Sequence, residues 1–260
     1  MVAGVSAPAL PPVFVINLAR DTDRRAHMAA LLARIGLPAT FVPAVNGRSL
    51  PAAERARYDP ARALRVYGKP MLDAEIGCYL SHYRLWQRLL DEGLEAALIL
   101  EDDIEIDPVL PGLLADLLAC PPWLVVRLHS MRGRVLAPRR GAFRGRQVAA
   151  LRDGAGLFRL RTHTLGAAAY LIRAEGARRL LEYGRRIVLP VDQTMDRFWE
   201  NGIVPYVVRP FPVRQRAEFA SSIGARAAGP QSELPFGALL HRRLQRAEDG
   251  LRKRLHLLAS

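Results

Sequence analysis

Three consecutive acidic residues, Glu101, Asp102 and Asp103, directly follow the apolar run 96–100. An apolar run this short, placed soon after Gly93, is typical of a buried strand. Carboxylates at the end of a buried strand repel one another, so they are costly unless a cation or a basic partner neutralises them. Because ligands of open α/β sheets bind just beyond the carboxyl ends of the strands, this position predicts a binding site.

The spacing of the acids indicates what such a site would hold. Side chains alternate along extended backbone, so we expect Glu101 and Asp103 on one side and Asp102 on the other. Oxygen ligands on one side suit a hard divalent cation, Mg²⁺ or Mn²⁺, which itself often bridges phosphates. The alternative is an ordinary solvated loop or helix cap, where acidic residues are also common.

Composition limits the classes of protein that need to be considered. The chain has 260 residues, 50% of them apolar, and a net charge of +13. Such a charge favours anionic partners: phosphates, nucleic acid or an anionic membrane surface. Cys78 and Cys120 form neither a disulfide framework nor a metal-site spacing, which fits a reducing compartment. With no secretory signal or membrane-spanning run expected, we predict a cytoplasmic protein, soluble or peripheral on the inner face of the membrane.

The first segments predict a strand–helix–strand unit after a disordered leader at residues 1–12. Strand 13–18 is mostly apolar, helix 23–35 ends at a glycine, and a second strand covers 41–45. The turn after the first strand lacks Gly-x-Gly-x-x-Gly, which weakens a dinucleotide-binding interpretation. Its arginines are candidate ligands for a phosphate or a uridine group, or plain surface charges; they are Arg20, Arg24 and Arg25.

The middle of the chain predicts elements that surround the acids. Residues 46–73 are expected to form an irregular or helical insertion, and a helix should run from 73 to about 92 with Ser81 and His82 inside it. A histidine among apolar helical residues is more often a satisfied core group than a catalyst. Segment 127–161 holds ten arginines and one acid, so we expect a basic hairpin, either a solvated surface or a lid.

A second pair of carboxylates lies further along the chain. The small residues around Gly166 allow a close backbone approach to a ligand or a strand. Asp192 follows Pro190 at an expected helix N-cap, and Asp196 lies four residues on. Helix 174–183 precedes them, and residues 209–235 are expected to be loop-like.

Four ordered blocks, taken together, resemble glycosyltransferase family 25, the group similar to lipooligosaccharide galactosyltransferases. They span about residues 13–223 and consist of 15–18 with Arg20, Asp23, Arg24 and Arg25; 75–82; 98–103; and 166–172 leading to 189–192. The resemblance implies a GT-A-type fold: a Rossmann-like mixed sheet flanked by helices, classed as α/β. The arginine-rich segment 131–161 and the tail after residue 235 depart from the family pattern as we know it, which leaves the acceptor open.

The resemblance also implies roles. It implies an inverting transfer of a hexose to a saccharide or lipid-linked saccharide. UDP-galactose is the first candidate donor and UDP-glucose the second. Glu101 and Asp103 would hold the Mn²⁺ or Mg²⁺, and Asp192, with Asp196 second, would be the catalytic base. The donor contacts would be Asn17, Leu18, Arg20, Arg24, Ser81, His82 and Asp102.

Two other classes of function compete with this one. A basic nucleic-acid- or anion-binding protein would explain the charge, but no nucleic-acid motif appears and the acids would repel phosphates without a metal. An inactive family member serving as a scaffold is the second. Metal-dependent release of nucleoside diphosphate separates a transferase from both.

The C-terminal segment 236–259 predicts a basic amphipathic helix. Leucine and alanine recur in steps of three and four and define one face: Leu240, Leu244, Ala247, Leu251, Leu255 and Leu258. Six basic residues outnumber two acids. Such a helix could lie on an anionic leaflet or pack its leucines on the catalytic domain.

Overall fold

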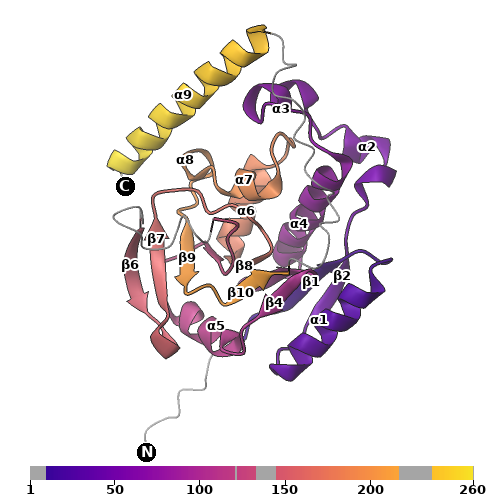
Figure 1. The fold of residues 1–260 in the computed structure, drawn as a ribbon, viewed down its shortest axis with the longest axis vertical. Coiled ribbons are helices and arrows are strands. Elements are labelled where there is room, and N and C mark those ends of the chain that lie inside the picture. Colours follow the sequence, from indigo (N-terminus) through magenta and orange to yellow (C-terminus); the bar gives the residue numbers. More distant parts are fainter. Residues whose placement is uncertain (1–9, 121, 133–144, 217–235, 260) are drawn as a thin grey trace, which may run out of the picture.

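The structure is a computed structural model that describes residues 10–120, 122–132, 145–216 and 236–259. A mixed eight-stranded sheet runs through it in the order β2-β1-β3-β8-β5-β9-β7-β6, with helices on both faces (Figure 1). The predicted α/β class, a mixed sheet flanked by helices, is therefore confirmed. The strands are β1 (Val13–Asn17), β2 (Thr40–Pro43), β3 (Ala96–Glu101), β4 (Ile104–Ile106), β5 (Val125–Arg127), β6 (Gly145–Ala150), β7 (Gly156–Leu160), β8 (Ala169–Arg173), β9 (Tyr206–Arg209) and β10 (Val213–Gln215).

The helices fall between these strands, except α9, which follows the last one; the sequence periodicity predicted the longer helices. They are α1 (Thr22–Arg34), α2 (Ala52–Arg55), α3 (Pro60–Val66), α4 (Asp73–Asp91), α5 (Leu110–Ala119), α6 (Ala174–Tyr183), α7 (Val191–Met195), α8 (Phe198–Asn201) and α9 (Phe236–Ala259), with 3-10 turns η1 (Gly47–Ser49) and η2 (Arg152–Gly154). In the view of Figure 1, α4 and α6 lie above the sheet and α1 and α5 below it.

Alternation along the buried strands divides the core into two layers. Leu98 and Leu100 of β3 pack with α1 and α5, whereas Ala97 and Ile99 pack with α4 and α6. A strand buried on both faces needs apolar residues at every position, which explains the unbroken run before Glu101.

The direction of the strands gathers several polar chain ends at one edge. β1, β3 and β5 run the same way, and β8 runs antiparallel between β3 and β5. The carboxyl ends of β1, β3 and β5 therefore lie beside the start of β8, where Glu101 N donates to Ala168 O at 2.8 Å. This edge brings together the acids after β3 and the residues around Gly166.

Two sequence expectations fail locally. The predicted loop 209–235 contains β10, which pairs antiparallel with β4 through Val213 and Ile106. Three-residue strands carry too little pattern to be seen in a sequence. The N-cap of α7 is Pro190, not Asp192, which is the second residue of the helix.

The basic segment forms the expected hairpin in its described part, where β6 pairs with β7. Residues 133–144 lie outside the described residues, so the lid remains a prediction. The same holds for residues 1–9 of the predicted leader. No helix among the described residues is both long and apolar enough to cross a bilayer.

Candidate functional site

A cavity of about 400 Å³ opens at the carboxyl ends of β1 and β3. Three segments enclose it: the turn from β1 into α1, the loop 44–48, and the first turns of α4. Its polar and charged lining residues are Arg20, Asp21, Arg24, Asn46, Arg48, Asp73, Cys78, Ser81, His82, Glu101, Asp102, Asp103 and Gln215. Three arginines thus face an acidic floor, which suits a phosphate-bearing ligand held together with a cation.

Two glycines allow the loop 44–48 to lie directly on α4. A Cβ at Gly47 would fall 1.6 Å from Asp73 O, and one at Gly77 would fall 2.5 Å from Val45 O. Ser81 adds a polar clamp, because its Oγ accepts from Val45 N at 2.8 Å and donates to Gly77 O. The wall of the cavity is therefore fixed by close backbone packing that no larger residue would permit.

Asp102 is held by the first strand and helix. Its Oδ2 accepts from Asn17 Nδ2 at 2.7 Å, and its Oδ1 accepts from Arg24 NH1 at 3.1 Å. Burial raises the pKa of Asp102, although both donors act in the opposite direction. β3 ends at Glu101, so strict alternation does not continue, and all three acids line the same cavity.

Asp103 is the acid whose charge is least compensated. Its Oδ2 accepts from Gln215 Nε2 at 2.9 Å, but its buried Oδ1 has no partner among the described residues. Burial, followed by the charge of Glu101, raises the pKa of Asp103 to about 6. A buried carboxylate oxygen without a donor is what a cation would neutralise, so the residues present fit a divalent metal.

A hydrogen-bond chain from α4 and β8 orients Glu101. Trp86 Nε1 can only donate, so the Tyr170 oxygen accepts from it at 2.9 Å. The Tyr170 hydroxyl then donates to His82 Nδ1 (2.9 Å), which leaves the Nε2 proton for Glu101 Oε1 at 3.3 Å. Although burial raises it, the pKa of Glu101 is held below its usual value mainly by His82. His82 is thus a satisfied core residue that also touches the site.

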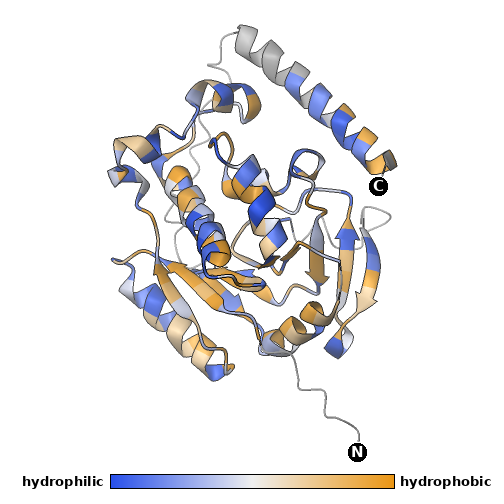
Figure 2. Ribbon diagram, turned by 180° about the vertical axis from the view of Figure 1, so that it is seen from behind, coloured by the Kyte–Doolittle hydropathy of each residue, from blue (hydrophilic) through white to orange (hydrophobic). Residues whose placement is uncertain are grey.

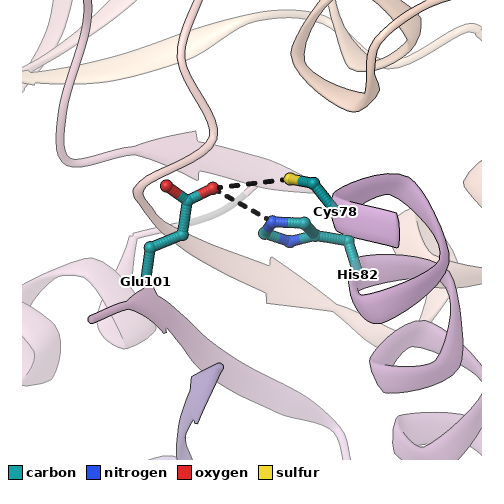
Figure 3. Close-up of side chains that lie close together, drawn as sticks. All are labelled: Cys78, His82 and Glu101. Carbon is teal, nitrogen blue, oxygen red and sulfur yellow. Dashed lines mark hydrogen bonds and ion pairs between the residues drawn. The ribbon is translucent and has the colours of Figure 1, made fainter. Parts of the chain in front are cut away.

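Figure 3 shows that one oxygen of Glu101 accepts hydrogen bonds from both the His82 ring and the Cys78 thiol. Ligand atoms of these three residues all lie within 4.8 Å of one another, which makes them a candidate metal cluster. The tautomer above favours hydrogen bonding instead, because the proton on Nε2 occupies the lone pair that a metal would need. The second oxygen of Glu101 points away from both neighbours in Figure 3.

The other two predicted acids lie at the same edge of the sheet but in a different environment. Asp192 accepts from Gly166 N (3.0 Å) and Gln193 N (2.9 Å), and burial raises its pKa. Asp196 accepts from Thr164 N, Thr164 Oγ1 and Leu165 N, the shortest at 2.5 Å. Neither acid lines the cavity. The thiol of the half-buried Cys78 has a raised pKa because of desolvation first and then the charges of Glu101, Asp192 and Asp103.

The structure therefore brings most of the predicted donor-site residues together. Leu18, Arg20, Arg24, Ser81, His82 and Asp102 line the cavity with Glu101 and Asp103, and Asn17 holds Asp102 from behind. Sequence reasoning missed Arg48, Gln215 and His129. Arg48 and Gln215 lie in segments without periodic signal, and His129 follows a three-residue strand.

The fold and the cavity define a class of protein. It is an α/β protein whose strand ends carry arginines that can bind phosphate and a buried carboxylate that a cation would neutralise. A family model described as "Glycosyltransferase family 25 (LPS biosynthesis protein)" matches residues 10–195. The chain belongs to glycosyltransferase family 25, as the resemblance had indicated.

Curated relatives carry the same family name. A "Glycosyltransferase 25 family member" of Anopheles gambiae is 30% identical over 74% of this chain and 32% of its own length. "Procollagen galactosyltransferase 1" of Danio rerio is 26% identical over 80% of this chain and 35% of its own. "Inactive glycosyltransferase 25 family member 3" of Homo sapiens is 28% identical over 76% and 35%. The chain thus spans about a third of the length of these relatives.

A solved structure shows a more distant similarity. It is described as a glycosyltransferase involved in the glycosylation of the major capsid of PBCV-1. The match covers 70% of this chain and 72% of that one, with 11% identity and a TM-score of 0.36.

Proposed function

We propose that this protein is an inverting glycosyltransferase that moves a hexose, galactose in the first place, from a UDP-sugar to a saccharide acceptor. The product would belong to a surface glycan such as lipopolysaccharide or lipooligosaccharide. The observation that carries the proposal is the buried Asp103 carboxylate, with one oxygen lacking a partner among the described residues, in a cavity that arginines also line. Family membership supports the reaction class.

The acids and arginines would divide the work at the donor. Asp103, through its unpartnered oxygen, and Glu101, through the oxygen that does not contact His82, would hold Mn²⁺ or Mg²⁺. When bound, such an ion supplies Lewis-acid neutralisation of the leaving diphosphate. Arg20 and Arg48 line the same cavity and add positive charge, while Arg24 already pairs with Asp102.

An inverting transfer also needs a base for the attacking hydroxyl, and Asp192 is the better of the two predicted candidates. Two backbone N–H groups fix its carboxylate, which leaves lone pairs to accept a proton. Asp196 accepts three hydrogen bonds and lies 3.8 Å from the Arg127 guanidinium, so its oxygens are more fully used. Asp196 remains the second candidate.

A donor screen tests the proposal. Purified protein with Mn²⁺ is offered UDP-galactose, UDP-glucose and other nucleotide sugars, and free nucleoside diphosphate is measured with and without EDTA. Release that requires metal and prefers one UDP-sugar supports the proposal. No release from any donor, with UDP binding retained, would instead indicate an inactive member, as the name of the human relative describes that protein. Binding of nucleic acid but not of UDP would indicate the anion-binding alternative.

We also propose that the acceptor is lipid-linked and that α9 contacts an anionic membrane surface at the cytoplasmic face. Asp249 of α9 accepts hydrogen bonds from the two terminal nitrogens of the Arg197 guanidinium, at 2.5 and 2.9 Å, and the His256 ring lies 5.6 Å from the Phe198 ring. The described part of α9 therefore docks through polar and aromatic contacts. Leu251, Leu255 and Leu258 stay exposed (59%, 57% and 85%).

The exposure of these three leucines supports the membrane proposal over packing of the leucine face on the catalytic domain, since Asp249 and His256 make the contacts of α9 with α8 and its N-cap. Figure 2 shows hydrophilic and hydrophobic segments alternating along the C-terminal half of α9, at the periphery of the molecule. An apolar stripe flanked by arginines suits the boundary of an anionic leaflet.

Co-sedimentation with anionic vesicles at low salt tests this. The triple change Leu251→Gln, Leu255→Gln and Leu258→Gln should remove most binding and leave UDP release unchanged, since none of these three leucines lines the cavity. Ala29→Gln, on the exposed side of α1, is the control for added polar surface. Equal binding of the triple variant and the parent protein would reject the membrane contact.

A further inference from the structure

A second hollow adjoins the donor cavity on the side of β10. It is open, with a volume of about 510 Å³, and is lined by His129, Ser130, Met131, Arg209, Pro210, Phe211, Val213, Arg214 and Gln215. Gln215 lines both hollows and donates to Asp103. A ligand in the second hollow would therefore lie next to the acid that we assign to the metal and leaving group.

His129 gives this hollow an unused hydrogen-bonding atom. Its side chain is buried, with 8% exposed, and its Nε2 has no partner among the described residues. The Nδ1 atom lies 3.4 Å from Val213 O, which can only accept, so Nδ1 carries the proton and Nε2 presents a lone pair. An N–H or a hydroxyl group of a ligand would satisfy it.

The rest of the hollow combines apolar and cationic surface. Met131 is 50% exposed, and Arg209 lies over the Phe211 ring at 5.0 Å. Apolar faces of this kind contact the C–H faces of sugar rings, and arginines bind carboxylate or phosphate groups.

Arg214 stands out because no described acid pairs with it. Glu105 lies opposite Arg214 in the β4–β10 pair, but the Glu105 carboxylate is engaged by Arg216 at 3.3 Å and His27 at 3.5 Å. Among the residues that the structure describes, no acidic side chain lines this hollow. The charge of its lining therefore favours anions over cations.

We propose that this hollow is the acceptor subsite and that it takes a saccharide bearing a carboxylate or phosphate group. Arg214, assisted by Arg209, binds the anionic group, and His129 Nε2 accepts a hydrogen bond from a sugar hydroxyl. The assignment as an acceptor site rests on the proposed glycosyltransferase function. Binding of an anionic saccharide does not depend on that function, so the binding site and the glycosyltransferase function can be tested separately.

The experiment compares two probes that differ in one charge, p-nitrophenyl β-glucuronide and p-nitrophenyl β-glucoside. Their dissociation constants are measured by NMR titration of the full chain with UDP and the diamagnetic ion Mg²⁺ present. We expect the glucuronide to bind more tightly, by about tenfold or more, because a hydrogen bond to a charged group is among the stronger polar contacts. Arg214→Gln should abolish this preference, and Arg214→Lys should keep part of it.

Two further variants keep the result interpretable. Arg34→Gln, an exposed arginine at the end of α1, is the matched control and should change neither dissociation constant. His129→Asn keeps a donor near the Nδ1 position but removes the Nε2 lone pair, so it should weaken both glycosides to a similar degree. His129→Gln, which can place an oxygen near Nε2, should restore part of the binding.

The outcomes separate the two proposals. Equal affinity for both glycosides, or a glucuronide preference that survives Arg214→Gln, would overturn the anionic subsite. The same protein is assayed for metal-dependent hydrolysis of UDP-galactose, in which water takes the galactosyl group and UDP leaves, so no saccharide acceptor is needed. If the protein releases no UDP but still prefers the glucuronide, the proposed glycosyltransferase function is rejected and the anionic binding site is retained.

Discussion

Two groups of carboxylates lie at the same edge of the sheet and have opposite environments. Asp192 and Asp196 receive backbone N–H groups from the loop at Thr164, Leu165 and Gly166. Asp103 receives one side-chain amide and keeps a buried oxygen without a partner among the described residues. Aspartates at the same edge thus have different roles, because the hydrogen-bond donors around them differ.

This difference indicates that Asp192 and Asp196 hold a loop in place, whereas Asp103 is available to a ligand. Asp192 and Asp196, whose oxygens are occupied by hydrogen-bond donors, form the saturated group. Arg127 belongs to the same network, since its NH1 donates to Gly166 O at 2.7 Å and its NH2 lies 3.8 Å from Asp196. That network holds a backbone turn in which Leu165 and Gly166 both adopt positive φ. Asp103 has a single side-chain donor, Gln215, and its second oxygen has no partner among the described residues, so its charge can be matched by a ligand.

The largest effect should come from Asp103→Asn. The amide keeps the shape of the side chain but removes the charge that would hold the metal. We expect metal-dependent release of UDP to fall by about 10³-fold or more, while circular dichroism and UDP binding without metal stay close to the parent. Full turnover in this variant, or full parental turnover in EDTA, would remove Asp103 from the metal site.

Asp192→Asn tests whether the saturated group also contributes to chemistry. The amide can still accept from Gly166 N through its oxygen but cannot take a proton. Transfer to an acceptor should fall by about 10²–10⁴-fold with donor affinity nearly unchanged. If this variant transfers at the parental rate and Asp196→Asn is dead but folded, the base is Asp196.

Asp196→Asn should instead act on stability. One of its oxygens becomes an N–H₂ group that faces backbone donors, and Arg127 loses a buried partner charge. We expect a loss of about 2–4 kcal/mol in the free energy of unfolding, measured by urea denaturation. Asp116→Asn, which breaks a surface pair with Arg152, is the control and should cost less than about 1 kcal/mol. Similar losses in both variants would contradict the difference between buried and exposed acids.

The smallest effect concerns pH. The pKa of Asp103 in the folded protein is about 6, above its ordinary value of 3.8. The unfolded chain therefore releases this proton first, and the contribution of Asp103 to stability is present below about pH 4 and lost as the pH rises through 6. The change is about 2–3 kcal/mol at most.

Urea unfolding between pH 4 and 7 measures this contribution. Asp103→Asn should flatten the difference between these pH values, and Mn²⁺ should reduce it in the parent protein. An identical pH profile in the variant would show that other buried acids, such as Asp192, account for it.

The sequence by itself determined the elements that are long or fully buried. The apolar run before Glu101 required a strand covered on both faces, and the periodicity of α4 and α9 required helices, because these patterns reflect burial that a sequence records directly. The acid cluster and the arginines after β1 were visible for the same reason: charge beside buried strands is costly without a partner. The family blocks were also readable in the sequence.

Only the tertiary structure decided how each acid is used. The donors to Asp102, Asp103 and Asp196 come from residues between 31 and 112 positions away along the chain, and no local pattern encodes such pairings. β10 places Gln215 on Asp103, and the end of β5 places His129 beside β10. The sequence showed which residues carry charge, whereas packing between distant strands decided which charges were satisfied and which were left for a ligand.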